Sequence, residues 1–299
     1  MRDKMKIVGI DLGGTTIKGG LVDLHGNIIK KTVRETGHNP AGILESISSI
    51  IDDLSVDEDI LGIGIGSPGF IDSEEGKVLS YGGMIYDWEW TDIKGYLSEK
   101  FTNQIIEVEN DANIAALCEK WVGSAKKLDD FIMITLGTGL GGAIYTPNER
   151  IWNGYRYQGG ELGHAILYPQ GKLCKCGQEG CVENYVSGSA IEAEYKELAG
   201  KQLKGEKIFK LYNENAKAKK VIDDFALNLA IYLISLRNIF DPQGIVIGGG
   251  LINSSVYWWD IMMKEYSKRV NFQGMEILPA TYLNESGIIG AAKMIVDKR

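Results

Sequence analysis

Short apolar runs separated by glycine and polar turn residues recur along the first half of the chain and predict β-strands. The first three runs, at residues 6–10, 17–23 and 28–33, are joined by tight turns and predict a β-meander. Residues 41–54 carry apolar side chains at helical spacing, and the apolar run 60–66 that follows predicts another strand. This alternation of strands and helices is typical of an α/β protein.

The second half of the chain repeats part of this pattern and then becomes mainly helical. Residues 131–136 and 140–145 predict two strands, and residues 245–247 predict one buried strand within the last third. Helices are expected at 221–240, 254–270 and 286–296, the last of which carries small residues suited to close packing.

A strand and a helix meet at Asp111. The apolar run 105–108 predicts a buried strand, and residues 112–121 have the apolar spacing of a helix. Ligands of open α/β sheets bind at the carboxyl ends of strands, so Asp111 is a candidate general base. An aspartate at this position is also a good helix N-cap, and the local pattern taken alone favours that role. The remaining motifs of the chain favour the base.

Two similar turns suggest that the chain contains an internal duplication. The first is Gly13-Gly14-Thr15-Thr16 and the second is Gly137-Thr138-Gly139, and each lies between two apolar strands. Glycines let backbone N–H groups approach an anion closely, and threonines add hydroxyl donors. One such turn can be an ordinary glycine hairpin. Two of them facing one cleft predict a polyphosphate ligand, and hence a nucleotide.

Composition and charge narrow the class of protein. The chain has 299 residues, 44% hydrophobic and 24% charged, which is close to the globular average. The net charge of −8 argues against a nucleic-acid surface and against an anionic membrane surface. We find neither an apolar run long enough to span a bilayer nor an apolar signal segment, so we expect a cytoplasmic, reduced protein.

Cysteines cluster in one short segment. Cys174, Cys176 and Cys181 lie within eight residues, and His164 precedes them by ten. Three thiolates and one imidazole form the ligand set of a closed zinc site, so we predict structural Zn²⁺ at these four residues. The alternative is a reduced loop without metal. Cys118, in the helix after Asp111, is expected in the core.

Two further segments contain candidate ligand contacts. Gly248-Gly249-Gly250 follows a buried strand and can let an adenine and its ribose lie against bare backbone. Residues 80–90 are rich in aromatic side chains, which can either stack on a sugar or form a packed surface loop; the sequence favours neither.

Taken together, these motifs resemble the ROK family of repressors, open reading frames and sugar kinases. The resemblance covers nearly the whole chain. It rests on motifs at 11–16, 109–113, 136–139, 160–164, 174–183 and 247–250. It implies an α/β chain with the actin-like, ribonuclease-H-like ATPase fold, with two α/β domains around a central cleft. We place the small domain at residues 1–116, completed by the C-terminal helix 286–299. The large domain with the zinc-binding loop is placed at 117–285.

The resemblance also implies roles for individual residues. In kinases of the family, positions matching Asp111 act as the base. Those holding sugar hydroxyls match Asn110, Asp111, Glu161, His164 and Glu183, and His164 with the three clustered cysteines binds zinc. ATP is expected at Asp11, Gly13, Gly14, Thr15, Thr16, Lys18, Gly137, Thr138, Gly139, Gly248, Gly249 and Gly250. Mg²⁺ is expected to bridge the phosphates, with Asp11 orienting its water shell. The partners expected are a small-molecule sugar, ATP and a second copy of the chain in a homodimer.

The subfamily motifs point in two directions. Residues 67–72 and 82–85 resemble β-glucoside kinases, whereas the zinc cysteines resemble glucokinases and N-acetylmannosamine kinases. The resemblance therefore implies an ATP-dependent kinase for the 6-hydroxyl of glucose or an N-acetylhexosamine such as N-acetylmannosamine, or else a β-glucoside kinase. Repressors of the family carry an N-terminal helix-turn-helix, for which the first strand leaves no room, and the net charge does not suit DNA. A sugar-sensing regulator of this type would therefore lack a DNA-binding domain, and this alternative is disfavoured. An actin-like filament protein is a further alternative, but such a protein would not need a cluster of Glu161, His164 and Glu183.

Overall fold

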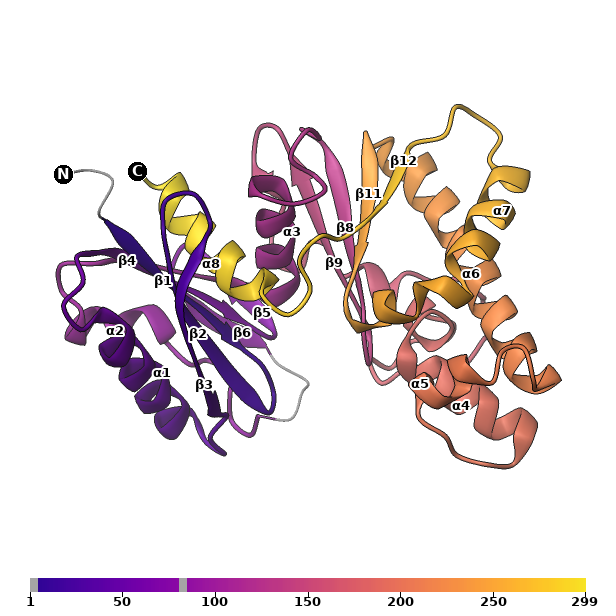
Figure 1. Cartoon of the computed structure of the whole chain (residues 1–299), viewed down its shortest axis with the longest axis horizontal. Helices are drawn as coiled ribbons and strands as arrows, with labels where there is room; N and C mark the ends of the chain where they lie inside the picture. Colours follow the sequence, from indigo (N-terminus) through magenta and orange to yellow (C-terminus); the bar gives the residue numbers. More distant parts are fainter. Residues whose placement is uncertain (1–4, 81–84) are drawn as a thin grey trace. The chain divides into compact units, whose positions relative to one another are not determined.

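The computed structural model describes residues 5–80 and 85–299. The chain divides into two compact units. Unit 1 comprises Met1–Lys127, Ile151–Gly159 and Tyr282–Arg299, and unit 2 comprises Leu128–Arg150 and Gly160–Thr281. Each unit is built on one five-stranded sheet with helices packed on it (Figure 1). The expected α/β architecture is therefore confirmed.

The sheet of unit 1 has the order β3-β2-β1-β4-β7. Its strands are β1 (Lys6–Leu12), β2 (Thr16–Val22), β3 (Ile28–Glu35), β4 (Ile60–Ser67) and β7 (Ile105–Asn110). The first three strands pair antiparallel, which confirms the predicted meander. Strands β4 and β7 continue the sheet in parallel, so β1, β4 and β7 end at one common edge. A short hairpin, β5 (Phe70–Asp72) and β6 (Lys77–Ser80), follows β4.

Helices cover both faces of this sheet. They are α1 (Pro40–Ser55), α2 (Ile93–Lys100), α3 (Asp111–Trp121) and α8 (Ser286–Asp297). Val8 and Ile10 pack with side chains of α1 and α2, whereas Ile7 packs with Ile288 of α8, as the two-residue period of a strand requires. Gly64 allows α8 to approach closely, because a Cβ there would lie 1.9 Å from the carbonyl oxygen of Ala291.

The sheet of unit 2 has the order β10-β9-β8-β11-β12. Its strands are β8 (Phe131–Leu136), β9 (Leu140–Thr146), β10 (Arg150–Ile151), β11 (Gly244–Gly248) and β12 (Glu276–Pro279). Strands β8 and β9 form an antiparallel hairpin, and β11 and β12 run parallel to β8. Both sheets thus place two parallel strands beside a hairpin that contains a Gly/Thr turn, which agrees with the predicted repeat.

The helices of unit 2 are α4 (Gly188–Ala199), α5 (Gly205–Lys210), α6 (Ala216–Phe240) and α7 (Trp259–Arg269). The long helix α6 supplies much of the apolar core of this unit. It confirms the helix predicted at 221–240 and ends at Asp241, which has a left-handed backbone conformation with φ of 46°.

Two expectations for the last third of the chain were wrong. Residues 254–270 do not form one helix: a 3₁₀ helix (Gly250–Tyr257) precedes α7, and the break lies at Trp258. The Trp258 side chain is fully buried, its ring centroid lies 5.5 Å from that of Phe225, and its Nε1–H donates to the carbonyl of Leu251. The last third also contains a second strand, β12, whose four residues pair with β11.

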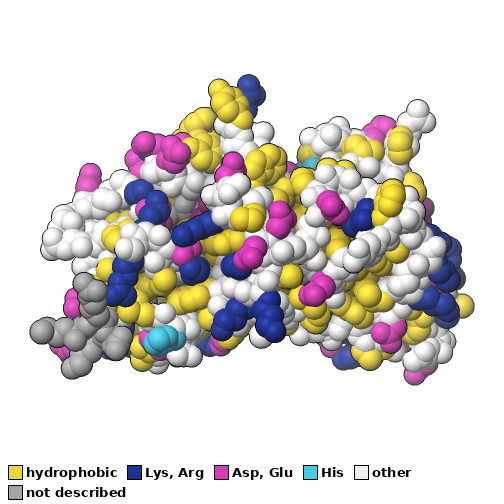
Figure 2. All heavy atoms as spheres, turned by 90° about the horizontal axis from the view of Figure 1, so that it is seen from above, with side chains coloured by type: hydrophobic (Ala, Val, Ile, Leu, Met, Phe, Trp, Pro, Cys, Tyr) yellow, Lys and Arg dark blue, Asp and Glu magenta, His cyan; other side chains and the backbone are white. Residues whose placement is uncertain are grey.

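The helices and the surface bear on the partners expected for this chain. In the described part of the chain, each helix is too short or too polar to cross a membrane. Figure 2 shows basic and acidic side chains interspersed on the face drawn there. Tyr81, one of the aromatic residues at 80–90, and Gly82-Gly83-Met84 of the β-glucoside kinase motif lie outside the described residues.

Candidate functional site

Polar residues of unit 1 gather at the carboxyl edge of its parallel strands. Asp11 on β1 pairs in register with Gly66 on β4, which pairs with Glu109 on β7. Neighbouring strands lie about 4.8 Å apart, so Asp11 and Glu109 are separated by roughly 10 Å along this edge. Asn110 and Asp111 follow Glu109 directly. The predicted base and the predicted magnesium-orienting residue therefore share the edge where α/β sheets bind ligands.

The N-cap of α3 is Asn110, so Asp111 does not have the capping role that its local pattern favoured. The side-chain oxygen of Asn110 accepts hydrogen bonds from the backbone N–H groups of Ala112, at 2.8 Å, and Asn113, at 3.4 Å. Asp111 is the first residue of the helix, and its side chain is exposed. A negative charge is stabilised at this end of a helix, so the position suits an aspartate side chain.

The first Gly/Thr turn joins β1 to β2. The Gly13 N–H donates to the carbonyl of Thr16 at 2.9 Å, and Gly14 and Thr15 are exposed at the tip. Lys18 faces Asp11 across the hairpin, with its Nζ 3.5 Å from Asp11 Oδ2. Burial raises the pKa of Asp11, and the positive charge of Lys18 offsets part of that rise.

The second Gly/Thr turn lies against the start of α4. The N–H groups of Gly188 and Ser189 donate to the carbonyls of Gly137 and Thr138, at 2.8 and 3.2 Å. A cavity of about 450 Å³ opens beside this turn, a volume within the range of small-molecule sites. It is lined by Gly137, Thr138, Gly188, Ser189, Glu192, Lys204, Gly205, Glu206, Gly250 and Leu251. Three of the residues expected to bind ATP thus share one cavity; Gly248 and Gly249 are not part of its described lining.

The residues expected to bind the sugar in unit 2 lie together beside the same turn. Glu161 precedes a short 3₁₀ segment that ends with His164, and Glu161 Oε2 lies 3.9 Å from His164 Nε2. Glu183 lies in a second 3₁₀ segment, and its Oε2 accepts the backbone N–H of Leu140 at 2.8 Å. Burial raises the pKa of Glu161, His164 lowers it, and the charge of Glu183 raises it further. Carboxylates grouped in this way accept hydrogen bonds from hydroxyl groups.

The predicted zinc ligands form one compact cluster. Their ligand atoms all lie within 4.8 Å of one another, and the cluster comprises His164, Cys174, Cys176 and Cys181. The Sγ atoms of Cys176 and Cys181 are 3.6 Å apart, and Cys174 Sγ lies 3.8 Å from His164 Nδ1. Tetrahedral zinc with Zn–S bonds of ~2.3 Å separates its ligand atoms by ~3.8 Å, so these side chains fit the ion.

The geometry of the cluster gives the two nitrogens of His164 separate tasks. Nδ1 faces the sulfurs, whereas Nε2 faces Glu161. A metal bound at one nitrogen fixes the orientation of the ring and leaves the other nitrogen for a second partner. The backbone N–H of Gln178 lowers the pKa of Cys176 to about 7, which favours the thiolate that zinc requires. Cys118 lies in the core, as expected, and burial raises the pKa of its thiol.

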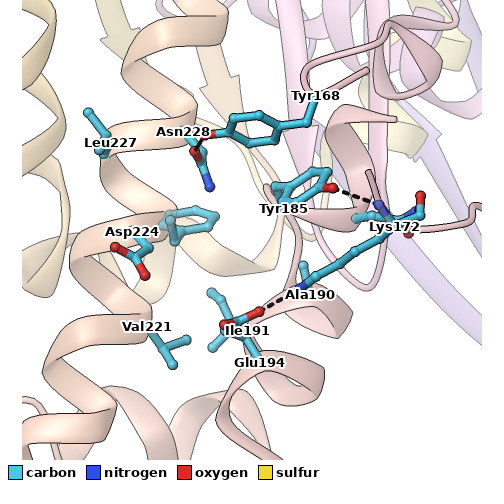
Figure 3. A pocket seen from close by; sticks show the side chains of 12 residues that line it. Tyr168, Lys172, Tyr185, Ala190, Ile191, Glu194, Val221, Asp224, Leu227 and Asn228 are labelled. Atoms are coloured by element: carbon cyan, nitrogen blue, oxygen red, sulfur yellow. Dashed lines mark hydrogen bonds and ion pairs between the residues drawn. The ribbon is translucent and has the colours of Figure 1, made fainter. Parts of the chain in front are cut away.

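A second cavity in unit 2, of about 400 Å³, lies where the loop that carries the clustered cysteines meets α4 and α6 (Figure 3). The Lys172 ammonium pairs with Glu194 of α4, and the Lys172 backbone N–H donates to the Tyr185 hydroxyl at 2.8 Å. Tyr168 donates to Asn228 of α6 at 2.6 Å. The described lining of this cavity includes none of the predicted site residues. These contacts anchor the loop that carries the clustered cysteines to α4 and α6 of its own unit.

The aromatic segment divides into buried and exposed residues. Trp88 is fully buried in the core of unit 1, and its Nε1–H donates to Ser67 Oγ at 3.1 Å. Of the two interpretations of this segment, stacking on a sugar or packing within the protein, packing therefore holds for Trp88. Tyr86 and Trp90 are 75% and 74% exposed.

No pattern in the sequence identifies several of the polar residues that lie at these sites. Asn153 contacts Glu109 and Asn113 from a segment 40 or more residues away along the chain. Ser189 and Lys204 line the cavity beside the second Gly/Thr turn. The contacts of Asn153 depend on the path of the chain after β10. Asn153-Gly154 is a recognisable turn dipeptide, but a turn signal does not name its partners.

Comparisons with known proteins place this chain among relatives of similar length. The glucokinase of Thermotoga maritima is 32% identical over 316 residues, covering 99% of this chain and 98% of the relative. The β-glucoside kinase of Listeria monocytogenes is 32% identical over 292 residues, covering 96% of each. A ROK family glucokinase from Streptomyces griseus, solved in complex with glucose and AMPPNP, has a TM-score of 0.82. It is 29% identical and covers 97% of this chain and 98% of that one.

The match to the ROK family runs from residue 7 to residue 298, nearly the whole chain. It includes both Gly/Thr turns, the junction at Asp111 and the His/Cys cluster described above. Because the match exceeds half of the chain and the relatives share about a third of their residues, this protein belongs to the ROK family.

Proposed function

We propose that this protein is an ATP-dependent hexose kinase that phosphorylates the 6-hydroxyl of glucose or of an N-acetylhexosamine such as N-acetylmannosamine. One observation carries the proposal. Glu183 contacts the Gly137-Thr138-Gly139 turn through its hydrogen bond with Leu140, while its charge acts on Glu161. Hydroxyl acceptors therefore lie directly beside a turn suited to phosphate, which is the juxtaposition that transfer of a phosphoryl group to a sugar requires.

Each group of residues has a task in this proposal. Asp111 accepts the proton of the sugar hydroxyl as that oxygen attacks the γ-phosphate of ATP. Asn110, Glu161, His164 and Glu183 hold the other hydroxyls. The two Gly/Thr turns, with Gly248-Gly249-Gly250, bind the nucleotide, and Lys18 supplies positive charge near its phosphates. Asp11 orients the hydration shell of Mg²⁺, which neutralises phosphate charge when bound.

Zinc has a structural task in the proposed enzyme. His164 and the three clustered cysteines would supply four protein ligands, which leaves no open position for a substrate, so the ion would supply orientation rather than Lewis acidity. His164 can then present Nε2 to a sugar hydroxyl in a fixed direction.

A β-glucoside kinase of the same family is the second candidate. It is favoured by the Listeria relative, which is as similar to this chain as the Thermotoga glucokinase is. The two candidates differ in whether the substrate carries a group at its anomeric oxygen.

A sugar panel tests the proposal and separates the candidates. We expect ADP release with Mg-ATP on one member of a set comprising glucose, N-acetylmannosamine, N-acetylglucosamine, mannose, fructose and cellobiose. Preference for cellobiose over glucose indicates the β-glucoside kinase. No turnover on any sugar by a folded, ATP-binding protein contradicts the proposal.

Two alanine substitutions in the second Gly/Thr turn are expected to affect different substrates. A Cβ at residue 139 would lie 2.3 Å from Glu183 Oε2, so Gly139→Ala displaces that carboxylate. Loss of a charged hydrogen bond costs about 1.5–3 kcal/mol, so we expect the KM for sugar to rise ~10–150-fold. Gly137→Ala meets no atom within 4 Å but lies in the lining of the cavity beside the turn, so it should raise the KM for ATP. Steady-state kinetics with each substrate varied provides the check, and equal effects on both constants contradict the assignment.

A further inference from the structure

A ring of three side chains surrounds the start of α3. Asn113 Nδ2 donates to Glu109 Oε1 and to Asn153 Oδ1, each at 3.0 Å. Asn153 Nδ2 closes the ring by donating to Glu109 Oε2, also at 3.0 Å. Its second N–H donates to Ser73 Oγ at 2.9 Å. One asparagine thus joins the end of β7, the first turn of α3 and the β5–β6 turn, all within unit 1.

Both oxygens of the Glu109 carboxylate accept hydrogen bonds. Besides the two asparagine amides, its Oε1 accepts the backbone N–H of Asn110 at 2.7 Å. The side chains of Glu109 and Asn113 are buried, each 6% exposed. Burial raises the pKa of Glu109, and these three donors offset part of that rise. An ionised carboxylate has enough acceptor sites for all three donors.

This arrangement is a costly way to gain stability. A buried charge loses its hydration, and an apolar side chain of similar size often serves stability as well or better. A fully satisfied polar network, by contrast, fixes the positions of the groups it joins. The ring holds both sides of Asp111, because Glu109 and Asn113 lie two residues before and two residues after it.

The segment that carries Asn153 is itself held in one conformation. The backbone N–H of Gly159 donates to the carbonyl of Asn153 at 2.8 Å and closes the loop. Residue 159 must be glycine, since a Cβ there would lie 2.7 Å from the backbone of Asn153 and 2.8 Å from the nitrogen of Gly154. The loop therefore presents the Asn153 amide in a defined direction.

We propose that Asn153 is a positioning residue for phosphoryl transfer, which acts through Glu109 and Asn113 to fix the direction of Asp111. This inference rests on the proposed function. It assigns to residues outside the sugar and nucleotide sites the task of keeping the base aligned with the sugar hydroxyl. Misplacing a reacting group by about 1 Å can cost ~10²-fold in rate, which is the scale of effect expected here.

The test exchanges the donor and the acceptor of one hydrogen bond. In N153D the new carboxylate faces the carboxylate of Glu109, so two hydrogen-bond acceptors meet. In E109Q the new amide N–H faces the N–H of the Asn153 amide, so two donors meet. In the double variant E109Q/N153D, the new amide at 109 donates to the new carboxylate at 153. The remaining amide oxygen at 109 still accepts from Asn110 and Asn113, and the new carboxylate accepts from Asn113 and Ser73. Each hydrogen bond of the ring then again joins one donor and one acceptor.

We expect kcat to fall ~10–100-fold in each single variant, with the KM values for ATP and sugar within about twofold of wild type. The double variant should regain at least ~10-fold over either single variant, because neighbouring substitutions are strongly non-additive. N153A should lower kcat similarly. Ser73→Ala keeps the bond between Asn153 and Glu109 and should have a smaller effect, and Asn148→Ala, an exposed asparagine of the preceding turn, should have none.

The outcomes separate this inference from the proposed function. If wild type phosphorylates a sugar of the panel while N153D and N153A retain its kcat, or if the double variant shows no recovery, the positioning role is wrong and the kinase stands. Melting temperatures of all variants identify losses due to unfolding, and N153A still tests the role if E109Q does not fold. If wild type phosphorylates no sugar, the proposed function fails and the positioning role falls with it.

Discussion

Asp111→Asn is expected to lower kcat and kcat/KM by ~10²–10⁴-fold while sugar binding persists, because a positioned general base contributes about that factor. The amide has nearly the shape of the carboxylate but cannot accept the proton of the sugar hydroxyl. The N-cap of α3 stays intact, since Asn110 supplies it. Removal of one negative charge from a helix start costs only about 0.3–1 kcal/mol of stability. The measurements are steady-state kinetics and sugar titration by calorimetry.

Asp260→Asn is the matched control for this substitution. Asp260 is an exposed acidic residue in the first turn of α7, so its replacement carries a similar helix-dipole cost without touching the proposed site. We expect kcat to be unchanged. Near-normal turnover in Asp111→Asn would remove Asp111 from the proton-transfer step. An unchanged kcat with a raised KM for sugar would instead assign it to binding alone.

Cys176→Ser is expected to lose bound zinc and to weaken sugar binding. A structural zinc ion contributes of order 10–16 kcal/mol to the folding of small zinc-binding peptides. Because that free energy depends on the complete set of ligands, we expect a protein with three of the four ligands to lose the ion to a chelator. Without the ion the His164 ring is no longer fixed, and we expect a loss of about 10–100-fold in kcat/KM, carried mainly by the KM for sugar. Metal content after dialysis against a chelator, measured by mass spectrometry, and sugar kinetics provide the checks.

Cys118→Ala serves as the control, because it removes a buried thiol that lies outside the His/Cys cluster. Its zinc content should equal that of wild type, although the small cavity it creates lowers the melting temperature. Wild-type zinc content in Cys176→Ser would refute the ligand assignment. Loss of zinc with unchanged KM for sugar would separate the metal from the sugar site.

Elements with a strong local pattern were predicted well from the sequence. The apolar spacing at 41–54 predicts α1 to within one residue at each end, because the side chains on one face of an amphipathic helix must all be buried. Spacing alone also grouped Cys174, Cys176 and Cys181 as zinc ligands with His164, and the structure brings all four together. Residues this close along the chain must also lie close together in the fold.

Elements that depend on distant partners were missed. The four-residue strand β12 ends at Pro279 and is a strand only because β11 lies beside it. The break between residues 250–257 and α7 follows from burial of Trp258 against Phe225, a contact between segments more than 30 residues apart. Periodicity could not detect this contact, because the apolar pattern continues across the break.

By itself, the sequence determined the ROK fold, the two Gly/Thr turns and the His/Cys cluster, because each is encoded in residues that lie close together along the chain and whose spacing limits what they can form. It also predicted Asp111 as the base, although the local pattern taken alone favoured a helix cap. The tertiary structure decided which neighbour caps α3, placed Glu183 against the second Gly/Thr turn, and brought Asn153 to Glu109 from 44 residues away. These contacts are set by chain path and burial, and hydrogen bonds between distant side chains form only after the sheet and its helices have fixed their positions.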